Sequence, residues 1–479
     1  MTKLTTTTMV LAMALALGGC AMLQPELPQA QPDIPASWPE PPTFKGVGAQ
    51  EAALAGEGDQ IAASAIGWRD FFTDRKLVAI IARSLENNRD LREAALNVER
   101  TRAQYQLQRA DRFPSVGIQV NGQRYGGPAA STPDVYTAGV GISAFEVDLF
   151  GRVRNLSDAA LQQYFAQEEA RRAVQISLIG EIANVYLTLA ADIESQRVAQ
   201  ATLDDQMALF ELIQKRQAIG AVSALDVEQA RTTVETARAD AAQYAGFVAT
   251  GRNALALLAG GPVEDALLPR SFDLAVSGLA PLPGELPSSV LLRRPDVRQA
   301  EYLLRAANAN IGAARAAFFP SISLTGLYGS ASGELDGLFE SGTRIWSFAP
   351  SVNIPIFQGG RLNAQLDVAR VDRDLALSRY EKSIQAGFRD VADALALTRT
   401  LEARRAANRS LLDAAERTHR LSKERYDRGL DSYLILLDAQ RTMYAAQQGL
   451  IAAQLAEQDN RVRLYRVLGG GWNEGQAQN

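Results

Sequence analysis

The 479-residue chain has one cysteine, Cys20, and one histidine, His419. A single thiol excludes a disulfide within the chain. One histidine, with no second histidine or neighbouring cysteine, offers neither a zinc site nor a histidine-based catalytic triad. Charged residues surround His419 in the sequence, so we interpret it as a surface residue of a helix. The chain is therefore predicted not to be an enzyme: we expect no catalytic residue, no metal and no cofactor.

Proline is absent from two long stretches, since none lies between Pro133 and Pro262 and none follows Pro355. Because proline breaks helix interiors, these gaps mark where uninterrupted helix is allowed. An excess of basic residues is also lacking, because 49 Lys and Arg are mixed with 54 Asp and Glu. That balance provides no basic surface for nucleic acid. The composition indicates long helices and no nucleic-acid partner.

The N-terminus carries a targeting signal. Its apolar run, Met9 to Leu17, is too short to span a bilayer as a helix but suits a signal peptide. The run ends in Leu-Gly-Gly-Cys20, which resembles a bacterial lipobox and implies acylation of Cys20 after cleavage. Several acyl chains would anchor the chain stably, at roughly 0.8 kcal/mol per buried CH₂. An ordinary secretory signal with an incidental cysteine is the alternative. Ala21, by resemblance to bacterial lipoproteins, favours the outer membrane.

Two segments follow before the first strands. The proline-rich stretch Gln24 to Phe44 is predicted to be an extended tether. From Thr73 the spacing of apolar residues predicts helix up to Pro114. Residues 115–121 and 135–144 then alternate with period two, which predicts two strands joined by a loop. Taken alone, this charge-poor pair fits a membrane strand and a half-buried soluble strand equally well.

An internal duplication decides between these alternatives. Residues 321–328 and 344–354 alternate in the same way, and RADRFPSV at 109–116 matches RAAFFPSI at 315–322, 206 positions later. Each half therefore reads helix, two strands, helix, tip, helix. Four strands cannot close a membrane barrel, because the smallest such barrels need about eight. Several chains must share one barrel, and three copies would supply twelve strands.

Long helices and two tips complete each half. Residues 152–218 can form one helix of roughly 100 Å at about 1.5 Å per residue. In each half a glycine, Gly220 or Gly429, then meets a serine that can cap a new helix, Ser223 or Ser432. These new helices are predicted to run to about residues 259 and 468. We interpret each glycine-serine segment as the tip of a helical hairpin.

The lipobox, the paired Phe-Pro-Ser strand starts, the run Ser351 to Arg361 and the tip YDRGLDSYLILLDAQR (426–441) together resemble the TolC-type outer-membrane efflux channels, in their acylated OprM-like branch. The resemblance covers about 20–468. It implies a mainly α fold with a membrane β-barrel: a homotrimer whose long hairpins form an α-barrel tunnel continuous with a shared 12-stranded β-barrel. It also implies a periplasmic membrane-fusion adaptor protein, an inner-membrane efflux pump and outer-membrane lipid as partners.

The resemblance divides the chain into six parts. We assign 1–19 to the signal peptide, 20–72 to the lipid-anchored extended segment with an equatorial contribution, 73–261 to repeat 1, 262–295 to an equatorial crossover, 296–468 to repeat 2 and 469–479 to a C-terminal tail. The equatorial region lies near mid-tunnel in the family and would draw on residues 45–72 and 262–295. The segment 260–294, rich in Pro and Gly, fits a non-helical crossover between the halves.

The second tip carries the candidate gate. Leu434, Asp438 and Arg441 are spaced by four and three, so they share one helical face. The resemblance implies that Leu434 and Asp438 form periplasmic constrictions, with Arg441 available to pair with the acid. Three copies of Asp438 would attract cations. The alternative is a solvated acid near a helix N-terminus. Because Ile435 stands where TolC has a second acid, and the first tip has Leu225 and Gln229, we expect three carboxylates.

The resemblance also implies a hairpin lock at Tyr426 and Asp226, positions whose hydrogen bonds tie adjacent hairpins together in the closed state. A surface tyrosine and an early-helix acid are the alternative. Asp431 stands where TolC has an arginine, so that part of the lock is not reproduced. The sequence thus predicts a passive exit duct for drugs or other small molecules in the cell outer membrane, with its helices in the periplasm. A lipid-anchored periplasmic coiled-coil scaffold without a pore is the rival hypothesis.

Overall fold

The computed structural model describes residues 23–35, 37–39, 67–126, 133–270, 272, 279–280 and 288–470. The predicted signal peptide, Cys20 and the tail after residue 470 lie outside this range. The chain divides into two compact units. We call Met1–Pro32, Leu96–Glu169 and Arg298–Ser383 the sheet unit, and Asp33–Ala95, Ala170–Val297 and Ile384–Asn479 the hairpin unit.

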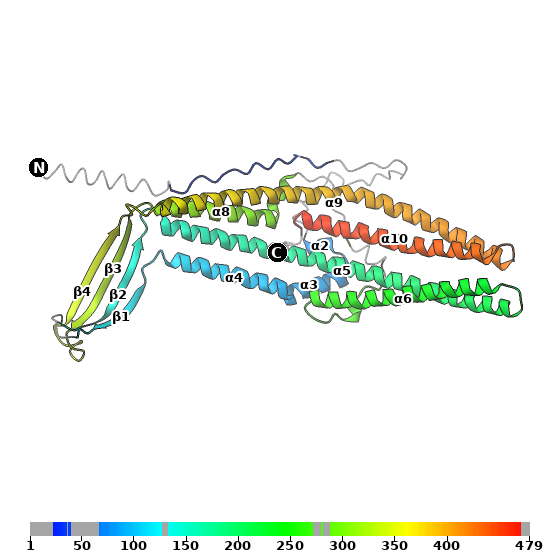
Figure 1. Cartoon of the computed structure of the whole chain (residues 1–479), viewed down its shortest axis with the longest axis horizontal. Coiled ribbons are helices and arrows are strands. Elements are labelled where there is room, and N and C mark those ends of the chain that lie inside the picture. Colours follow the sequence, from blue (N-terminus) through cyan, green and yellow to red (C-terminus); the bar gives the residue numbers. More distant parts are fainter. Residues whose placement is uncertain are drawn as a thin grey trace. The chain divides into compact units, whose positions relative to one another are not determined.

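The order of the elements confirms the duplication (Figure 1). After α2 (Trp68–Phe71) and α3 (Arg75–Asn87), the first half contains α4 (Arg89–Ala110), β1 (Val116–Gln123), β2 (Val135–Val147), α5 (Arg152–Ala218) and α6 (Ala224–Leu258). The second half contains α8 (Pro295–Ala316), β3 (Ser321–Ser332), β4 (Arg344–Asn353), α9 (Arg361–Asp427) and α10 (Tyr433–Val467). The short 3₁₀ helices η2 (Asp265–Leu267) and η3 (Ser288–Arg293) lie between the halves.

The long helices and their tips match the sequence prediction. Helices α5 and α9 have 67 residues each, and α6 and α10 have 35 each. Gly220 and Gly429 adopt φ angles of +76° and +72°, the left-handed conformation that ends a helix and favours glycine. One 18-residue window of α5 is apolar enough to cross a membrane by composition, but 61% of it is buried inside the chain. Its apolarity therefore fits a core helix.

One predicted helix is interrupted. The helix expected from Thr73 to Pro114 is two helices, α3 and α4, separated at Asn88. Asn88 has an extended ψ of 133°, and its Oδ1 accepts a hydrogen bond from the Leu91 amide at 3.0 Å. Its Nδ2 donates to the carbonyl oxygen of Leu258 at 3.0 Å. A contact with a residue 170 positions away thus fixes the break, which the helical periodicity could not reveal.

The sheet unit contains one antiparallel sheet with the order β1-β2-β3-β4. The register places Ile118, Val140, Tyr328 and Trp346 in one row across the four strands. Ile118 and Trp346 are 80% and 77% exposed, so apolar side chains cover an open face. Adjacent strand residues point to the opposite face, where the Ser323 and Ser351 hydroxyls lie 3.1 Å apart. The sheet is therefore apolar on one side and more polar on the other.

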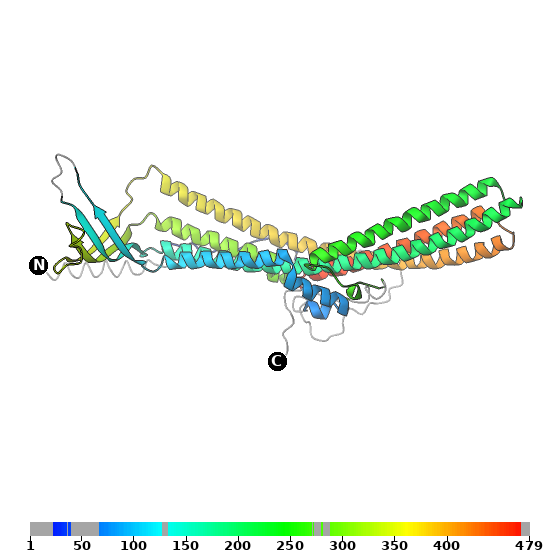
Figure 2. The same cartoon turned by 90° about the horizontal axis from the view of Figure 1, so that it is seen from below.

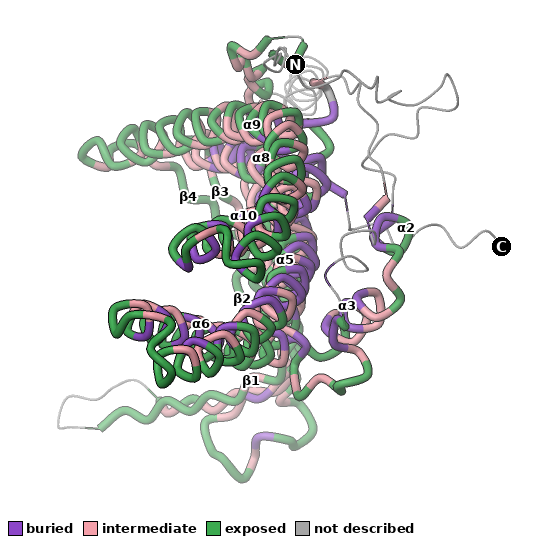
Figure 3. Tube along the Cα trace, turned by 90° about the vertical axis from the view of Figure 1, so that its right-hand side faces the viewer, coloured by how far each residue is buried: buried purple, intermediate pink, exposed green. Residues whose placement is uncertain are grey.

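The core of the hairpin unit lies around the middle of α5 (Figure 3). Trp68, Phe71 and Phe72 are fully buried there, and Phe71 stacks on Tyr465 of α10 at 4.0 Å between ring centroids. The Ala280 amide donates to the carbonyl oxygen of Phe71 at 2.8 Å. The segment before residue 73, the crossover and the end of α10 thus come together in the hairpin unit, and their assignment to an equatorial region stays a prediction.

The described part of the N-terminal segment is extended, as predicted. Within the sheet unit it lies against α8 and α9. The Arg315 guanidinium donates to the carbonyl oxygen of Leu23 at 3.1 Å, and Asn308 Nδ2 donates to that of Pro25 at 2.8 Å. Further along, the Gln31 amide donates to Glu381 Oε1 at 3.1 Å. These side chains hold a segment that has no regular structure of its own.

Candidate functional site

The two hairpin tips lie side by side in the hairpin unit (Figure 1, Figure 2). A small apolar core joins them, with Ile213 of α5 and Val227 of α6 packed against Tyr426 of α9 and Leu436 of α10. Buried residues of α10 alternate with exposed ones at helical spacing. The core therefore fixes which face of α10 remains free at the tip.

Leu434, Asp438 and Arg441 occupy that free face, as the spacing predicted. All three are exposed, with Leu434 at 59%, whereas Leu436 and Leu437 are buried. Because the Leu434 and Asp438 side chains remain exposed, they contribute little to the stability of the single folded chain. No ion pair joins Asp438 to Arg441 within the described residues.

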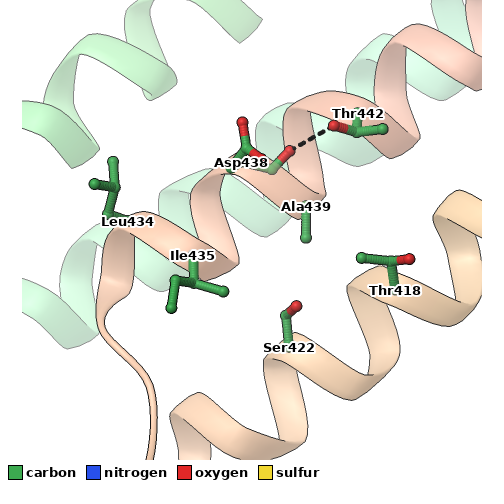
Figure 4. Close-up of a pocket in the computed structure, with 7 residues that line it drawn as sticks. All are labelled: Thr418, Ser422, Leu434, Ile435, Asp438, Ala439 and Thr442. Atoms are coloured by element: carbon green, nitrogen blue, oxygen red, sulfur yellow. Dashed lines mark hydrogen bonds between the residues drawn. The ribbon is translucent and has the colours of Figure 1, made fainter.

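A groove of about 470 Å³ lies between α9 and α10 beside these residues (Figure 4). Ile435 and Ala439 point toward Thr418 and Ser422 of α9, whereas Leu434 and Asp438 point away from α9. The remaining lining residue, Thr442, donates a hydrogen bond from its hydroxyl to the main-chain oxygen of Asp438 at 2.9 Å. The sequence did not predict that the hydroxyl groups of Thr418 and Ser422 line a groove, because no local signal shows which part of a long helix faces a second helix.

The second tip is closed by an ion pair within its own loop. Arg425 donates from Nε and a terminal nitrogen to the two carboxylate oxygens of Asp431, at 2.7 and 2.9 Å. The hydrogen bond from Arg425 lowers the pKa of Asp431. Asp431 departs from the TolC pattern, yet it has a local partner that ties the end of α9 to the start of α10.

The lock residues lie at the same interface but are engaged differently. Tyr426 is only 6% exposed, and the Arg216 guanidinium lies 5.2 Å from its ring centroid. In the described part of the chain, the Tyr426 hydroxyl has no hydrogen-bond partner. Asp226 accepts hydrogen bonds from the amide and the hydroxyl of Ser223 at 3.0 and 2.8 Å, which forms a capping box. The surface alternative therefore fails for Tyr426, whereas Asp226 serves its own helix.

His419 requires a correction. Its imidazole is half-buried, and Nε2 is buried without a hydrogen-bond partner among the described residues. Burial, helped by Lys423, lowers its pKa, and Asp205 opposes this shift. The interpretation of His419 as a plain surface residue was wrong because charged neighbours in the sequence do not show which side of α9 meets another helix.

Residues 80–261 and 286–470 both match the family model described as outer membrane efflux protein. The chain belongs to this family. It is 45% identical over 471 residues to the toluene efflux pump outer membrane protein TtgI of Pseudomonas putida, covering 96% of this chain and 97% of TtgI. It is 40% identical to the outer membrane protein OprJ of Pseudomonas aeruginosa, covering 98% and 96%.

Solved structures of outer-membrane channels have the same fold. The open state of the Neisseria gonorrhoeae MtrE channel aligns with a TM-score of 0.85 at 37% identity, covering 96% of this chain and 100% of MtrE. The channel OprN aligns with a TM-score of 0.82 at 28% identity, covering 93% and 99%. The TolC-type fold, the outer-membrane location and the efflux function are thereby confirmed. The relatives are transport proteins, so the hypothesis of a pore-free scaffold loses its support.

Proposed function

We propose that three copies of this chain form the passive outer-membrane exit duct of a tripartite efflux system. An inner-membrane pump and a periplasmic adaptor would deliver drugs, solvents or other small molecules to it. Relatives named as the outer membrane proteins of toluene and solvent efflux pumps support this role. The observation that carries the proposal is that each half of one duplicated chain contributes two strands to a membrane-type sheet and one long helical hairpin.

The sheet supports the trimer. Strands β1 and β4 each lie at an edge of the four-stranded sheet, with one side unpaired in the described chain. Unpaired backbone groups cannot face lipid, and four strands are too few to close a barrel. Pairing of β4 of one copy with β1 of the next satisfies both edges, and three copies give twelve strands.

The gate follows from the trimer. Threefold symmetry converts Leu434 and Asp438, which are exposed on the free face of α10, into a ring of leucines and a ring of carboxylates. A carboxylate ring attracts cations and repels anions. Arg441, exposed and without an ion pair to Asp438 within the described chain, is available to an acid of a neighbouring copy. Tyr426 would contribute to the lock with the hydroxyl that has no partner among the described residues, and Asp226 would offer the carboxylate.

The lipid anchor belongs to the same proposal. Cys20 precedes by three residues the carbonyl group of Leu23 that Arg315 holds. Arg315 lies in the last turn of α8, just before β3. Leu23 therefore lies near the start of β3, from where an acyl group on Cys20 would reach the outer membrane.

Conductance of the purified protein in planar bilayers tests the gate. We expect the wild type to prefer cations and Asp438→Ala to lose this preference several-fold, while Leu434→Ala raises the conductance. Asp427→Ala is the matched control, because it removes one acid from the same tip but from α9, where Asp427 accepts from Lys423 at 3.2 Å. A purified trimer without any conductance, even with Asp438 replaced, would contradict the proposed duct.

A further inference from the structure

Two side-chain hydrogen bonds join α6 to α10 beyond the tips. The Tyr444 hydroxyl donates to Asp240 Oδ2 at 3.1 Å, and the Tyr244 hydroxyl donates to Gln448 Oε1 at 3.1 Å. The bonds are reciprocal, because each helix contributes one tyrosine and one acceptor four positions away. We call these four residues the clasp.

The clasp lies on a small apolar layer that the two hairpins share. Tyr244 and Tyr444 pack against the cluster of Ala199, Leu203, Val234, Ala237 and Ala241. Burial raises the pKa of both tyrosines, with Asp240 adding to the effect. The phenols therefore remain neutral hydrogen-bond donors. Partial exclusion of water makes such bonds stronger and their loss more costly.

The duplication does not repeat the clasp. At the 209-residue offset that relates the two tips, α10 carries Gly449 and Ala453 in place of the α6 pair, and α6 carries Glu235 and Ala239 in place of the α10 pair. None of these four residues is a tyrosine, so the same pattern of bonds cannot form at the offset positions. The clasp is thus specific to the contact between the two hairpins of one chain and is not a general consequence of repeat packing.

Its place on α10 connects it to the gate. Tyr444 follows Asp438 by six residues, which is about 9 Å along the helix. Gln206 Nε2 donates to Gln440 Oε1 at 3.0 Å between these two positions, so α10 is also tied to α5. If α10 moves as one helix and carries Leu434 and Asp438 away from α6, these bonds must break. A solved relative is described as an open state, so channels of this fold open.

We propose that the arrangement seen here is the closed one, and that Tyr444, Asp240, Tyr244 and Gln448 are positioning residues that hold α10, and with it the gate, in that arrangement. This inference rests on the proposed function, because it takes Leu434 and Asp438 as the gate. The clasp does not line the gate; it acts by fixing the helix that carries the gate residues to the neighbouring hairpin.

Single-channel recording of the purified trimer tests the clasp. We expect Tyr244→Phe and Tyr444→Phe each to raise the open probability about fivefold, the factor that corresponds to about 1 kcal/mol for one hydrogen bond. Both variants keep the ring that packs on the apolar layer. Tyr164→Phe is the matched control, because the Tyr164 hydroxyl donates to Glu168 of the same helix, α5, and in the described part of the chain bonds to no second helix. It is expected to leave the open probability unchanged.

A second pair of variants separates the bond from a general loss of packing. Asp240→Asn keeps an oxygen that accepts from Tyr444 and should behave like the wild type, whereas Asp240→Leu should open the channel as Tyr444→Phe does. The clasp would be overturned if its variants had the same open probability as Tyr164→Phe while Asp438→Ala still reduced the cation preference. The proposed duct would be unaffected by that result. A wild-type protein with no conductance would instead overturn the proposed function, and the clasp with it.

Discussion

Burial strongly disfavours the charged form of the Asp459 carboxyl group in α10. Its Oδ1 is buried and has no hydrogen-bond partner in the described chain, and burial raises its pKa from 3.8 to about 6. Between these values the folded protein holds a proton that the unfolded chain releases. Stability therefore falls as the pH rises from about 4 to 6, and the cost remains at higher pH.

Asp459→Asn should raise the melting temperature of the purified protein by several degrees at pH 8 and leave it unchanged at pH 4. The two-unit shift of Asp459 corresponds to at most about 3 kcal/mol. Asp367→Asn provides the control, because its carboxylate is exposed and pairs with Arg370 only at the surface. An equal melting temperature of the Asp459→Asn and wild-type proteins at pH 8 would mean that Asp459 has a partner in the assembly.

At the scale of the element, the contact between β2 and β3 depends on glycine. Gly139 and Gly329 are paired in the register, and a Cβ on Gly139 would lie 2.7 Å from the carbonyl oxygen of Tyr328. A Cβ on Gly329 would overlap the carbonyl oxygen of Ala138. The two strands approach so closely that no side chain fits between them. A Cβ added to Gly117 of β1, in contrast, would have no atom beyond its chain neighbours within 4 Å.

Gly329→Ala should therefore lower the amount of folded protein in the outer membrane several-fold, because main-chain atoms of β2 must move before the sheet can pair. Gly117→Ala, on the same type of strand, should accumulate like the wild type. Quantitative immunoblots of membrane fractions measure both. Equal levels of the two variants would show that the β2–β3 contact relaxes without loss of the sheet.

At the scale of the whole molecule, the chain is incomplete by itself. The sheet has two open edges, and the apolar face that Ile118 and Trp346 share has no cover in the described chain. Lipid can cover that face, but only another strand can satisfy the edges. The stability of the sheet is therefore tied to assembly.

Cysteines at Ile118 of β1 and Trp346 of β4 should cross-link copies of the chain in pairs and trimers with a short bismaleimide. Within one chain β2 and β3 separate these strands, by about 14 Å at 4.8 Å per strand. Either cysteine alone should give no trimer on a denaturing gel. Only monomers from the double variant would contradict the shared barrel.

Much of this architecture could be predicted from local patterns. Helical periodicity without proline gave α5 as residues 152–218, alternation gave four strands, and glycine followed by serine gave both tips. Each of these signals acts over a few residues and is repeated after 206 to 209 positions, so each half supports the other. The face shared by Leu434, Asp438 and Arg441 follows from helix geometry alone.

Contacts between distant segments could not be predicted in this way. The break at Asn88, the burial of His419, the groove between α9 and α10 and the clasp each depend on which residues of two long helices meet. Helical periodicity fixes the face of a helix but not its partner or its register, because helices of this kind present similar small and apolar residues along their length. The elements, their order and the candidate gate face follow from local sequence patterns, whereas tertiary packing selects which polar groups between the hairpins find partners.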